Sequence, residues 1–288
     1  MDNLSFTIAQ ALSWATEQLS SHNVSDDGLY NSSVIDSKVL LAACLQREVV
    51  YLHTWPERLL DAIQIKLFQE YISQRSLGHP VAHIIGYRDF WSLRLKVSPA
   101  TLIPRPETEL LIEIVLNLTL GADSKVLDLG TGTGAIALAL ATENPHWLVT
   151  GIDKSSQAVA LATDNASMHQ LERVKFIQSD WFAAVEHRQF DLIVTNPPYI
   201  EDNNHYLQQG DVRFEPSSAL TSGEDGLDDI RSIVSQSKSF LTDSGWLVIE
   251  HGYQQSRQVT DILRAHGFNQ IRSELDLNGL PRVTIGCK

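Results

Sequence analysis

Four consecutive residues, Asn196, Pro197, Pro198 and Tyr199, could do chemistry on a planar NH2 group. The Asn196 side chain and the Pro197 carbonyl each offer an acceptor oxygen, the prolines stiffen the turn, and Tyr199 offers an aromatic wall. Two convergent acceptors can orient an amide or an aromatic amine and stabilise the positive charge that develops as its nitrogen attacks. This tetrapeptide therefore predicts attack by an NH2 group on an electrophilic carbon, without a metal ion or a strong base.

A glycine-rich loop, Asp128-Leu129-Gly130-Thr131-Gly132-Thr133-Gly134-Ala135, predicts an adenosine site. It joins a predicted strand to a predicted helix, and its glycines let the backbone turn sharply while a ligand approaches the main chain. Asp153 ends the next predicted strand, where a carboxylate can accept both ribose hydroxyls. Because Gly130, Gly132 and Ala135 also satisfy the dinucleotide pattern, the loop alone leaves NAD and S-adenosylmethionine open.

Two further features favour S-adenosylmethionine. Asp128 precedes the glycines, where NAD-binding folds more often have an apolar residue, and its carboxylate could orient the loop or meet the methionine ammonium. After the third predicted strand comes Ser179-Asp180-Trp181, in which Asp180 would meet the adenine amino group and Trp181 the adenine face. An acidic residue after a strand is also common as a helix cap.

Alternating strands and helices after about Thr108 must position these motifs. The apolar runs predict strands at 125–129, 148–152, 174–177, 191–195, 246–249, 271–273 and 282–285, a helix at 135–142, and a second helix capped by Ser155. Continuous apolar strands are typical of a parallel sheet that is covered by helices on both faces. The motifs then lie at the carboxyl ends of strands, where open α/β folds bind ligands.

The chain before this region is predicted to be helical over residues 1–77. Apolar side chains recur at helical spacing in three stretches, around 8–19, 36–46 and 60–71, and the polar residues of 20–28 mark a loop. This predicted domain has no cluster of catalytic residue types, which favours a role in recognition or support. Residues 78–106 are punctuated by Gly and Pro and predict a connector with a β-hairpin.

Overall composition is that of a globular protein with two domains. The chain has 288 residues, of which 43% are hydrophobic and 20% charged, so a coiled coil, a collagen or a disordered chain is excluded as the main architecture. Its two cysteines cannot form a disulfide framework or a four-ligand zinc site, and the pair His79 and His83, separated by Pro80, favours packed histidines over a metal site. We expect no metal ion.

The net charge and the N-terminal residues limit the kinds of partner and the compartment that we expect. The net charge of −13, without any run of Lys and Arg, argues against a nucleic-acid partner and favours a basic protein. No apolar run is long enough to span a bilayer, and residues 1–5 lack the basic start of a secretory signal. We therefore expect a cytoplasmic protein without membrane contact.

The sequence resembles the release-factor glutamine methyltransferases, the PrmC/HemK family, across nearly its whole length. The resemblance is carried by Ile103-Pro104-Arg105-Pro106-Glu107-Thr108-Glu109, the Asp128 glycine loop, Asn196-Pro197-Pro198-Tyr199, Glu215-Pro216 with Gly223 and Asp225-Gly226, Glu250-His251-Gly252, and the ending 276–282. It implies a small all-helical domain and a β-hairpin linker, followed over 107–288 by a seven-stranded Rossmann-like methyltransferase domain.

The resemblance also implies an activity. The family transfers methyl from S-adenosylmethionine, leaving S-adenosylhomocysteine, to the glutamine amide in the Gly-Gly-Gln motif of class 1 peptide-chain release factors. By this resemblance the cofactor is held by Asp128, Leu129, Gly130, Thr131, Gly132, Asp153 and Trp181, with Asp180 and Asn196 beside it. Asn196 and Pro197 accept from the glutamine amide, and Tyr199 packs against it. Glu107 and Glu109 either shape the donor pocket or begin the helix at Thr108; the role of Arg105 stays open, and His251 is expected to be packed.

Three alternatives remain at this point. An adenine-N6 methyltransferase of DNA or RNA would present the same planar NH2 group, although the net charge disfavours it. A nicotinamide oxidoreductase fits the glycines and leaves Asn196 to Tyr199 unexplained. A catalytically silent adaptor on the same fold conflicts with the intact tetrapeptide.

Overall fold

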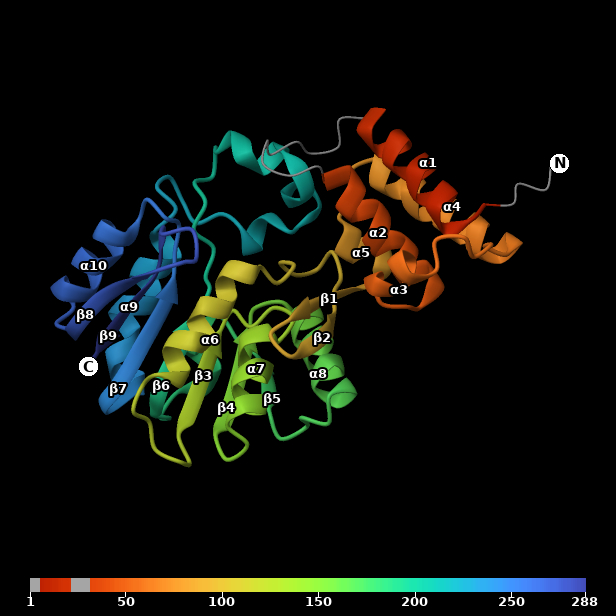
Figure 1. Cartoon of the computed structure of the whole chain (residues 1–288). Helices are drawn as coiled ribbons and strands as arrows, with labels where there is room; N and C mark the ends of the chain where they lie inside the picture. The colour runs from red at the N-terminus through yellow and green to blue at the C-terminus, as the bar shows by residue number, and fades with distance from the viewer. Residues whose placement is uncertain (1–5, 22–31) are drawn as a thin grey trace. The chain divides into compact units, whose positions relative to one another are not determined.

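The computed structural model describes residues 6–21 and 32–288, and the chain divides into two compact units. One unit is Met1–Gly86 with His205–Phe214; the other is Tyr87–Asn204 with Glu215–Lys288. Figure 1 labels their helices and strands. The N-terminal residues 1–5 and most of the predicted loop 20–28 lie outside the described residues, and Ser20 and Ser21 belong to the end of α1.

The smaller unit is built from five helices among its described residues. They are α1 (Ile8–Ser21), α2 (Ser32–Leu45), α3 (Val49–Thr54), α4 (Ala62–Ser76) and α5 (Val81–Ile85). The side chains of Ile8, Leu40 and Phe68 lie fully buried between them. Asp61 begins α4 with a capping box, in which it accepts from the Gln64 backbone N–H and donates its own N–H to the Gln64 side chain. The predicted apolar stripes are therefore the core of a helical bundle.

Residues 205–214 join this unit although they are distant from it in sequence. They form two short 3-10 helices, η3 (His205–Gln208) and η4 (Gly210–Phe214). The Arg75 side chain, 4% exposed, donates to Asp36 Oδ2 at 2.7 Å and to Asp211 Oδ1 at 2.8 Å. The His79 ring packs on Phe214 with 4.5 Å between ring centroids. Ion pairs around the buried Arg75 and an aromatic pair with His79 thus hold this segment against the end of α4 and the residues that follow it.

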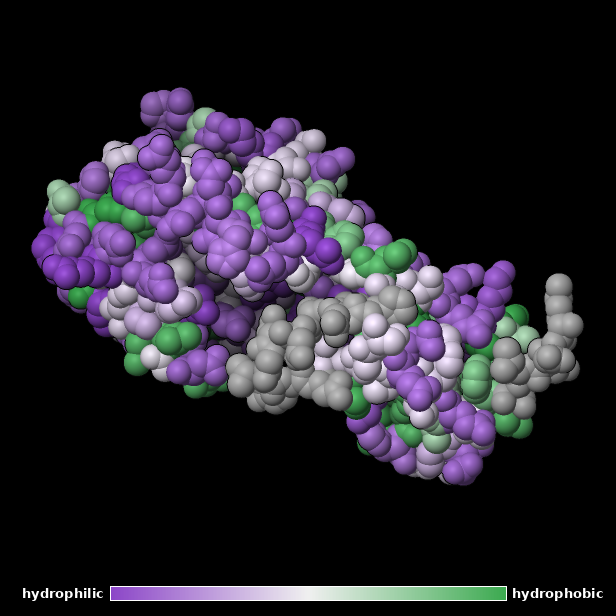
Figure 2. All heavy atoms as spheres, turned by 90° about the horizontal axis from the view of Figure 1, so that it is seen from above, coloured by the Kyte–Doolittle hydropathy of each residue, from purple (hydrophilic) through white to green (hydrophobic). Residues whose placement is uncertain are grey.

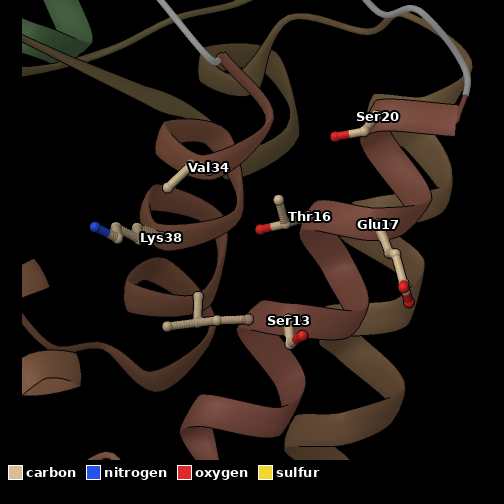
Figure 3. A pocket seen from close by; sticks show the side chains of 7 residues that line it. Ser13, Thr16, Glu17, Ser20, Val34 and Lys38 are labelled. Atoms are coloured by element: carbon tan, nitrogen blue, oxygen red, sulfur yellow. The ribbon is translucent and has the colours of Figure 1, made fainter.

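A shallow groove runs between α1 and α2, and Figure 3 shows it from close by. Its lining is mostly hydroxyl and aliphatic: Leu12, Ser13, Thr16, Glu17, Ser20, Val34 and Lys38. Among these lining residues the two charged side chains, Glu17 and Lys38, point away from one another. The groove therefore lacks a paired set of catalytic groups.

The larger unit contains a seven-stranded sheet, as expected. Its strands are β3 (Lys125–Leu129), β4 (Leu148–Asp153), β5 (Lys175–Gln178), β6 (Phe190–Thr195), β7 (Leu241–Glu250), β8 (Asn269–Leu275) and β9 (Pro281–Cys287), in the order β5-β4-β3-β6-β7-β9-β8. Strands β3 to β7 run parallel, and β9 is antiparallel to both β7 and β8. The predicted strands are confirmed with ends that differ by a few residues, and β7 is longer than predicted.

Helices cover both faces of this sheet. They are α6 (Glu109–Leu116), α7 (Ala135–Glu143), α8 (Ser156–Met168), α9 (Asp228–Phe240) and α10 (Ser256–Ala265), with short turns η1 (Pro106–Thr108), η2 (Trp181–Val185) and η5 (Ser217–Ala219). Val126 faces the core shared with α6 and α7, whereas its neighbour Leu127 faces the core shared with α9 and α10. Consecutive strand residues are buried on opposite faces, which explains the continuous apolar runs in the sequence.

The predicted hairpin packs on the same unit. Strands β1 (Tyr87–Phe90) and β2 (Leu93–Lys96) pair antiparallel, and Phe90, Leu93 and Leu95 enter the core beside α6 and α7. Hydrophilic residues dominate the face of the molecule drawn in Figure 2, interrupted by small hydrophobic areas. None of the helices within residues 6–21 and 32–288 is long and apolar enough to cross a membrane.

Candidate active site

The glycine loop connects β3 to α7 at the carboxyl edge of the sheet. Gly130 and Gly132 have φ values of +71° and +53°, in the left-handed region that side chains other than glycine rarely adopt. The Trp181 ring lies 3.6 Å from the position that a Cβ on Gly130 would occupy. The backbone of the loop therefore lies next to the Trp181 ring, and Gly130, Gly132 and Trp181 line the same cavity.

The buried carboxylate of Asp128 holds this loop in place through hydrogen bonds. It is fully buried, and its Oδ2 accepts from the Thr131 hydroxyl at 2.6 Å and from the Ala137 backbone N–H at 3.2 Å. Its Oδ1 is buried without a hydrogen-bond partner. Burial raises the pKa of Asp128 to about 7, and the two hydrogen bonds oppose that shift. These contacts are those of the loop-orienting role considered above.

Asp153 ends β4 next to the same loop. One carboxylate oxygen accepts from the Gly132 backbone N–H and the other from the Ser155 backbone N–H, both at 2.9 Å. The Ser155 side chain in turn accepts from the Ala158 N–H and caps α8, as predicted. A carboxylate has about four acceptor positions, so two remain on Asp153 for ligand hydroxyls.

A cavity of about 570 Å³ joins these groups, a size ordinary for a small-molecule site. Of the predicted site residues it is lined by Gly130, Thr131, Gly132, Asp153, Asp180, Trp181, Asn196 and Pro198. Asp128, Leu129, Pro197 and Tyr199 lie outside this lining. The structure thus brings the glycine loop, the ends of β4 and β5, and the turn after β6 to one hollow.

Ser179 and Asp180 of the Ser179-Asp180-Trp181 triplet make different kinds of contact. The Ser179 hydroxyl accepts from the Ala184 N–H at 2.9 Å and donates to the Trp181 carbonyl at 2.7 Å, which fixes the turn of η2. Asp180 makes no capping bond with its side chain and instead pairs with Lys154 at 3.0 Å in an exposed position. The helix-cap explanation of Asp180 is therefore replaced by an ion pair at the cavity rim.

The turn at 196–199 follows β6 and is held on several sides. The Asn196 side-chain NH2 donates to Thr108 Oγ1 at 3.1 Å. The Tyr199 backbone N–H donates to the Leu220 carbonyl, and the Tyr199 carbonyl accepts from the Gln255 side chain at 3.0 Å. Burial is the main cause that raises the pKa of Tyr199, and the nearby Glu250 carboxylate is the second. The phenol therefore stays neutral at physiological pH.

Polar residues to which sequence reasoning gave no role surround this turn. Glu250, the last residue of β7, is 2% exposed, and burial raises its pKa to about 7 against hydrogen bonding from Thr108 and Asn196. Within residues 6–21 and 32–288, neither its Oε2 nor the buried hydroxyl of Thr101, which lines the cavity, has a hydrogen-bond partner. The available signal was an acidic residue that directly follows the apolar run 246–249 at the end of a strand.

Arg105, Glu109 and His251, whose roles the sequence left open or expected to be structural, have defined contacts. Arg105 lines the cavity and donates from Nη2 to both oxygens of buried Glu215, at 2.7 and 2.9 Å. Glu109 accepts from the Trp91 backbone N–H at 2.7 Å in the hairpin turn. His251 is fully buried, with Nε2 2.8 Å from the Thr284 hydroxyl, and burial lowers its pKa. Glu109 and His251 lie outside the cavity lining.

Comparison with known proteins gives matches to two family models and to named relatives. Residues 106–214 match the family "Methyltransferase small domain", and residues 10–86 match "PrmC N-terminal domain". A protein named release factor glutamine methyltransferase from Shewanella oneidensis is 47% identical, covering 97% of this chain and 95% of its own. Its namesake from Pseudomonas aeruginosa is 51% identical over 88% of this chain and 92% of its own.

Solved structures share the fold at low identity. The human Mettl16 catalytic domain in complex with an RNA hairpin has a TM-score of 0.57 at 15% identity, covering 75% of this chain and 80% of that one. The Thermus thermophilus 16S rRNA N2 G1207 methyltransferase, in complex with AdoMet and guanosine, has a TM-score of 0.51 at 20% identity, covering 70% and 49%. These likenesses concern the fold alone.

Proposed function

We propose that this chain, which belongs to the release factor glutamine methyltransferase family, methylates the glutamine side-chain amide of the Gly-Gly-Gln motif in class 1 peptide-chain release factors. Membership makes the chain an S-adenosylmethionine-dependent glutamine methyltransferase, and it removes the nicotinamide oxidoreductase and the silent adaptor from the alternatives. The observation that carries the proposal is that Asn196 and Pro198 line the same cavity as the glycine loop and Asp153.

The cavity residues fit S-adenosylmethionine. Gly130 and Gly132 line the cavity together with Trp181, and Asp153 keeps acceptor positions for ribose hydroxyls. We propose that these residues hold the nucleoside, with Asp180 at the adenine edge. S-adenosylmethionine bound here would supply an electrophilic methyl group on sulfur.

The turn after β6 is proposed to prepare the substrate nitrogen. Asn196 Oδ1 and the Pro197 carbonyl accept from the glutamine NH2 and so aim its lone pair, while the Tyr199 ring packs against the amide plane. An amide lone pair is delocalised and weakly nucleophilic, so orientation and the stabilisation of developing positive charge are the contributions that these residues make. His251 is buried with both ring nitrogens occupied by neighbours, which is consistent with chemistry that needs no strong base.

Methylation of a purified substrate tests this proposal. The protein is incubated with a class 1 release factor and a labelled methyl donor, and the product is mapped by mass spectrometry. The proposal expects one methyl group on the glutamine of Gly-Gly-Gln and none on a release factor with alanine in its place. Methyl transfer to adenine in nucleic acid, with an unmodified release factor, would support the adenine-N6 alternative instead. The proposal places this reaction in the cytoplasm.

A further inference from the structure

We infer that Glu250 is a positioning residue for the reaction: acting through Thr108, it fixes which end of the Asn196 side-chain amide faces the substrate. The inference rests on the proposed function, because it concerns the acceptor that would hold the substrate NH2. It adds a role for two residues to which the sequence motif alone gave none.

The sheet places Asn196 and Glu250 side by side. Strands β6 and β7 are parallel neighbours, and their register pairs Thr195 with Ile249. Asn196 directly follows the end of β6 and Glu250 is the last residue of β7, so both come next after this pair at the carboxyl edge of the sheet. Thr108, in the last position of η1, is buried at the same point and contacts Asn196.

The hydrogen bond between Asn196 and Thr108 has a defined direction. The Asn196 Nδ2 group donates to Thr108 Oγ1 at 3.1 Å, which leaves the Thr108 hydroxyl proton free to donate elsewhere. Glu250 is the buried carboxyl group beside it, and Thr108 and Asn196 both act to lower its pKa against the effect of burial. An ionised carboxylate can only accept hydrogen bonds. It therefore favours the arrangement in which the Thr108 hydroxyl proton and the Asn196 NH2 group face it.

The orientation of the Asn196 amide decides which of its atoms faces the cavity. With Nδ2 turned toward Thr108 and Glu250, Asn196 Oδ1 is the atom left for a ligand in the cavity. A reversed amide would place its NH2 donors against the NH2 donors of the substrate and would leave Oδ1 facing a carboxylate. Buried polar groups without partners are costly, so the ionised Glu250 disfavours the reversed state.

The ionisation of Glu250 should then be visible in the pH profile. Its charged surroundings are Arg282 on β9, which lowers its pKa, and Glu107 on η1, which raises it; the neutral Tyr199 phenol faces the same group. A protonated Glu250 can donate to Thr108 and release Asn196 from its single orientation. Turnover should therefore rise with pH as Glu250 ionises, and this component should be missing in a variant without the carboxyl group.

Conservative variants test the relay. Glu250→Gln and Thr108→Val keep shape but remove the acceptor or the hydroxyl, and each should lower kcat on the order of 10- to 100-fold through misorientation. The affinity for S-adenosylhomocysteine, measured by calorimetry, should change less than about threefold, since neither residue is proposed to hold the nucleoside. Thr108→Ser retains the hydroxyl and should restore most of the kcat that Thr108→Val loses, which a purely packing role of the threonine methyl group would not produce.

An exchange of the two groups gives the sharpest comparison. In Asn196→Asp two carboxylates face one Thr108 proton, whereas Asn196→Asp combined with Glu250→Gln again provides one carboxylate and one amide. The double variant should turn over faster than Asn196→Asp alone, which a merely structural role for Glu250 would not produce. Normal kcat and an unchanged pH profile in both Glu250→Gln and Thr108→Val would overturn the inference.

A readout without substrate separates this inference from the proposed function. The Asn196 side-chain NH2 signal, observed by NMR in the full chain, should be protected from exchange and should lose that protection in Thr108→Val and Glu250→Gln. Unprotected protons in the unmodified protein would overturn the inference directly. Failure of the unmodified protein to methylate any release factor would instead contradict the proposed function.

Discussion

The backbone N–H of Gly132 donates a 2.9 Å hydrogen bond to Oδ2 of Asp153, so the residue that ends β4 also holds the glycine loop that follows β3. The register that pairs Leu129 with Ile152 brings the two strand ends to this contact. Asp153 therefore combines two contributions: it shapes the loop on which a nucleoside would lie, and it offers acceptor positions toward that nucleoside.

Replacement of Asp153 by Ala should weaken S-adenosylmethionine binding by about 1.5–3 kcal/mol, the range for hydrogen bonds to a charged group. The loss arises from missing ribose contacts and from loss of the hydrogen bond that holds the Gly132 backbone N–H. Asp153→Asn is the control, because it keeps one acceptor oxygen and should lose less. Isothermal titration calorimetry measures both, and an unchanged affinity in Asp153→Ala would rule out the ribose role.

The catalytic half of the fold was predictable because its signals are local. Strand and helix runs, the cap at Ser155 and the glycine loop each depend on a few neighbouring residues, and the parallel sheet then follows from strands apolar on both faces. The turn at 196–199 and the loop at 128–135 meet because both follow parallel strands.

Contacts between distant residues were not predictable in the same way. Arg75 and Asp211 are far apart in the sequence, and nothing local to 205–214 indicates that this segment leaves the sheet unit to join the helical one. The partnership of Asn196, Thr108 and Glu250 likewise depends on which strand neighbours β6, which a single sequence does not specify. Glu250 looked like a strand end, and only its burial beside Asn196 gives it a role.

Arg75 should be a sensitive point of the helical unit. Its guanidinium is buried between Asp36 and Asp211 and also donates to the His79 carbonyl at 3.1 Å. Removing Arg75 leaves two neighbouring carboxylates without their shared cation, which is destabilising, although their partial exposure keeps the cost below the range of about 3–5 kcal/mol for a fully buried pair. Arg75→Ala should therefore destabilise α4 and free residues 205–214.

Hydrogen exchange with mass spectrometry checks this expectation. Peptides covering 205–214 should exchange much faster in Arg75→Ala, while those of β3 and α7 should keep their protection. Arg94→Ala is a suitable control, because the Arg94–Asp89 pair is exposed and contributes little. Unchanged exchange of 205–214 would mean that the ion pairs of Arg75 do not hold the segment.

Asp128 and Glu250 should contribute stability that falls as pH rises from about 4 to 7. Burial raises the pKa of both Asp128 and Glu250 to about 7, from 3.8 and 4.5 in the unfolded chain. The folded protein thus retains protons that the unfolded chain has lost. This stabilisation is fully present below the pKa values of the unfolded chain and is lost as the pH rises through the pKa values of the folded protein. Each group contributes a slope of up to about −1.4 kcal/mol per pH unit.

Urea unfolding at a series of pH values measures this slope. Glu250→Gln cannot titrate, so its stability should decline less steeply between pH 4 and 7 than that of the unmodified protein. Equal slopes in the two proteins would show that Glu250 is ionised in the folded state throughout this range.

The central claim is that the turn after β6 is the reacting centre, and replacement of Asn196 tests it. Asn196→Ala removes one of two proposed acceptors for the substrate NH2, so the chemical step should slow on the order of 10²–10³-fold, by analogy with loss of one preorganised hydrogen bond. Donor binding should change less than turnover. Asn196→Asp should also be impaired, whereas a general-base mechanism would let it work as well as Asn or better.

The most direct measurement is single-turnover methylation of a release factor at saturating methyl donor, with the rate of glutamine methylation compared between the unmodified protein and Asn196→Ala. The account predicts a rate lower by on the order of 10²–10³-fold in a folded variant that still binds the donor. A near-normal rate in Asn196→Ala would contradict the assignment of residues 196–199 as the active site.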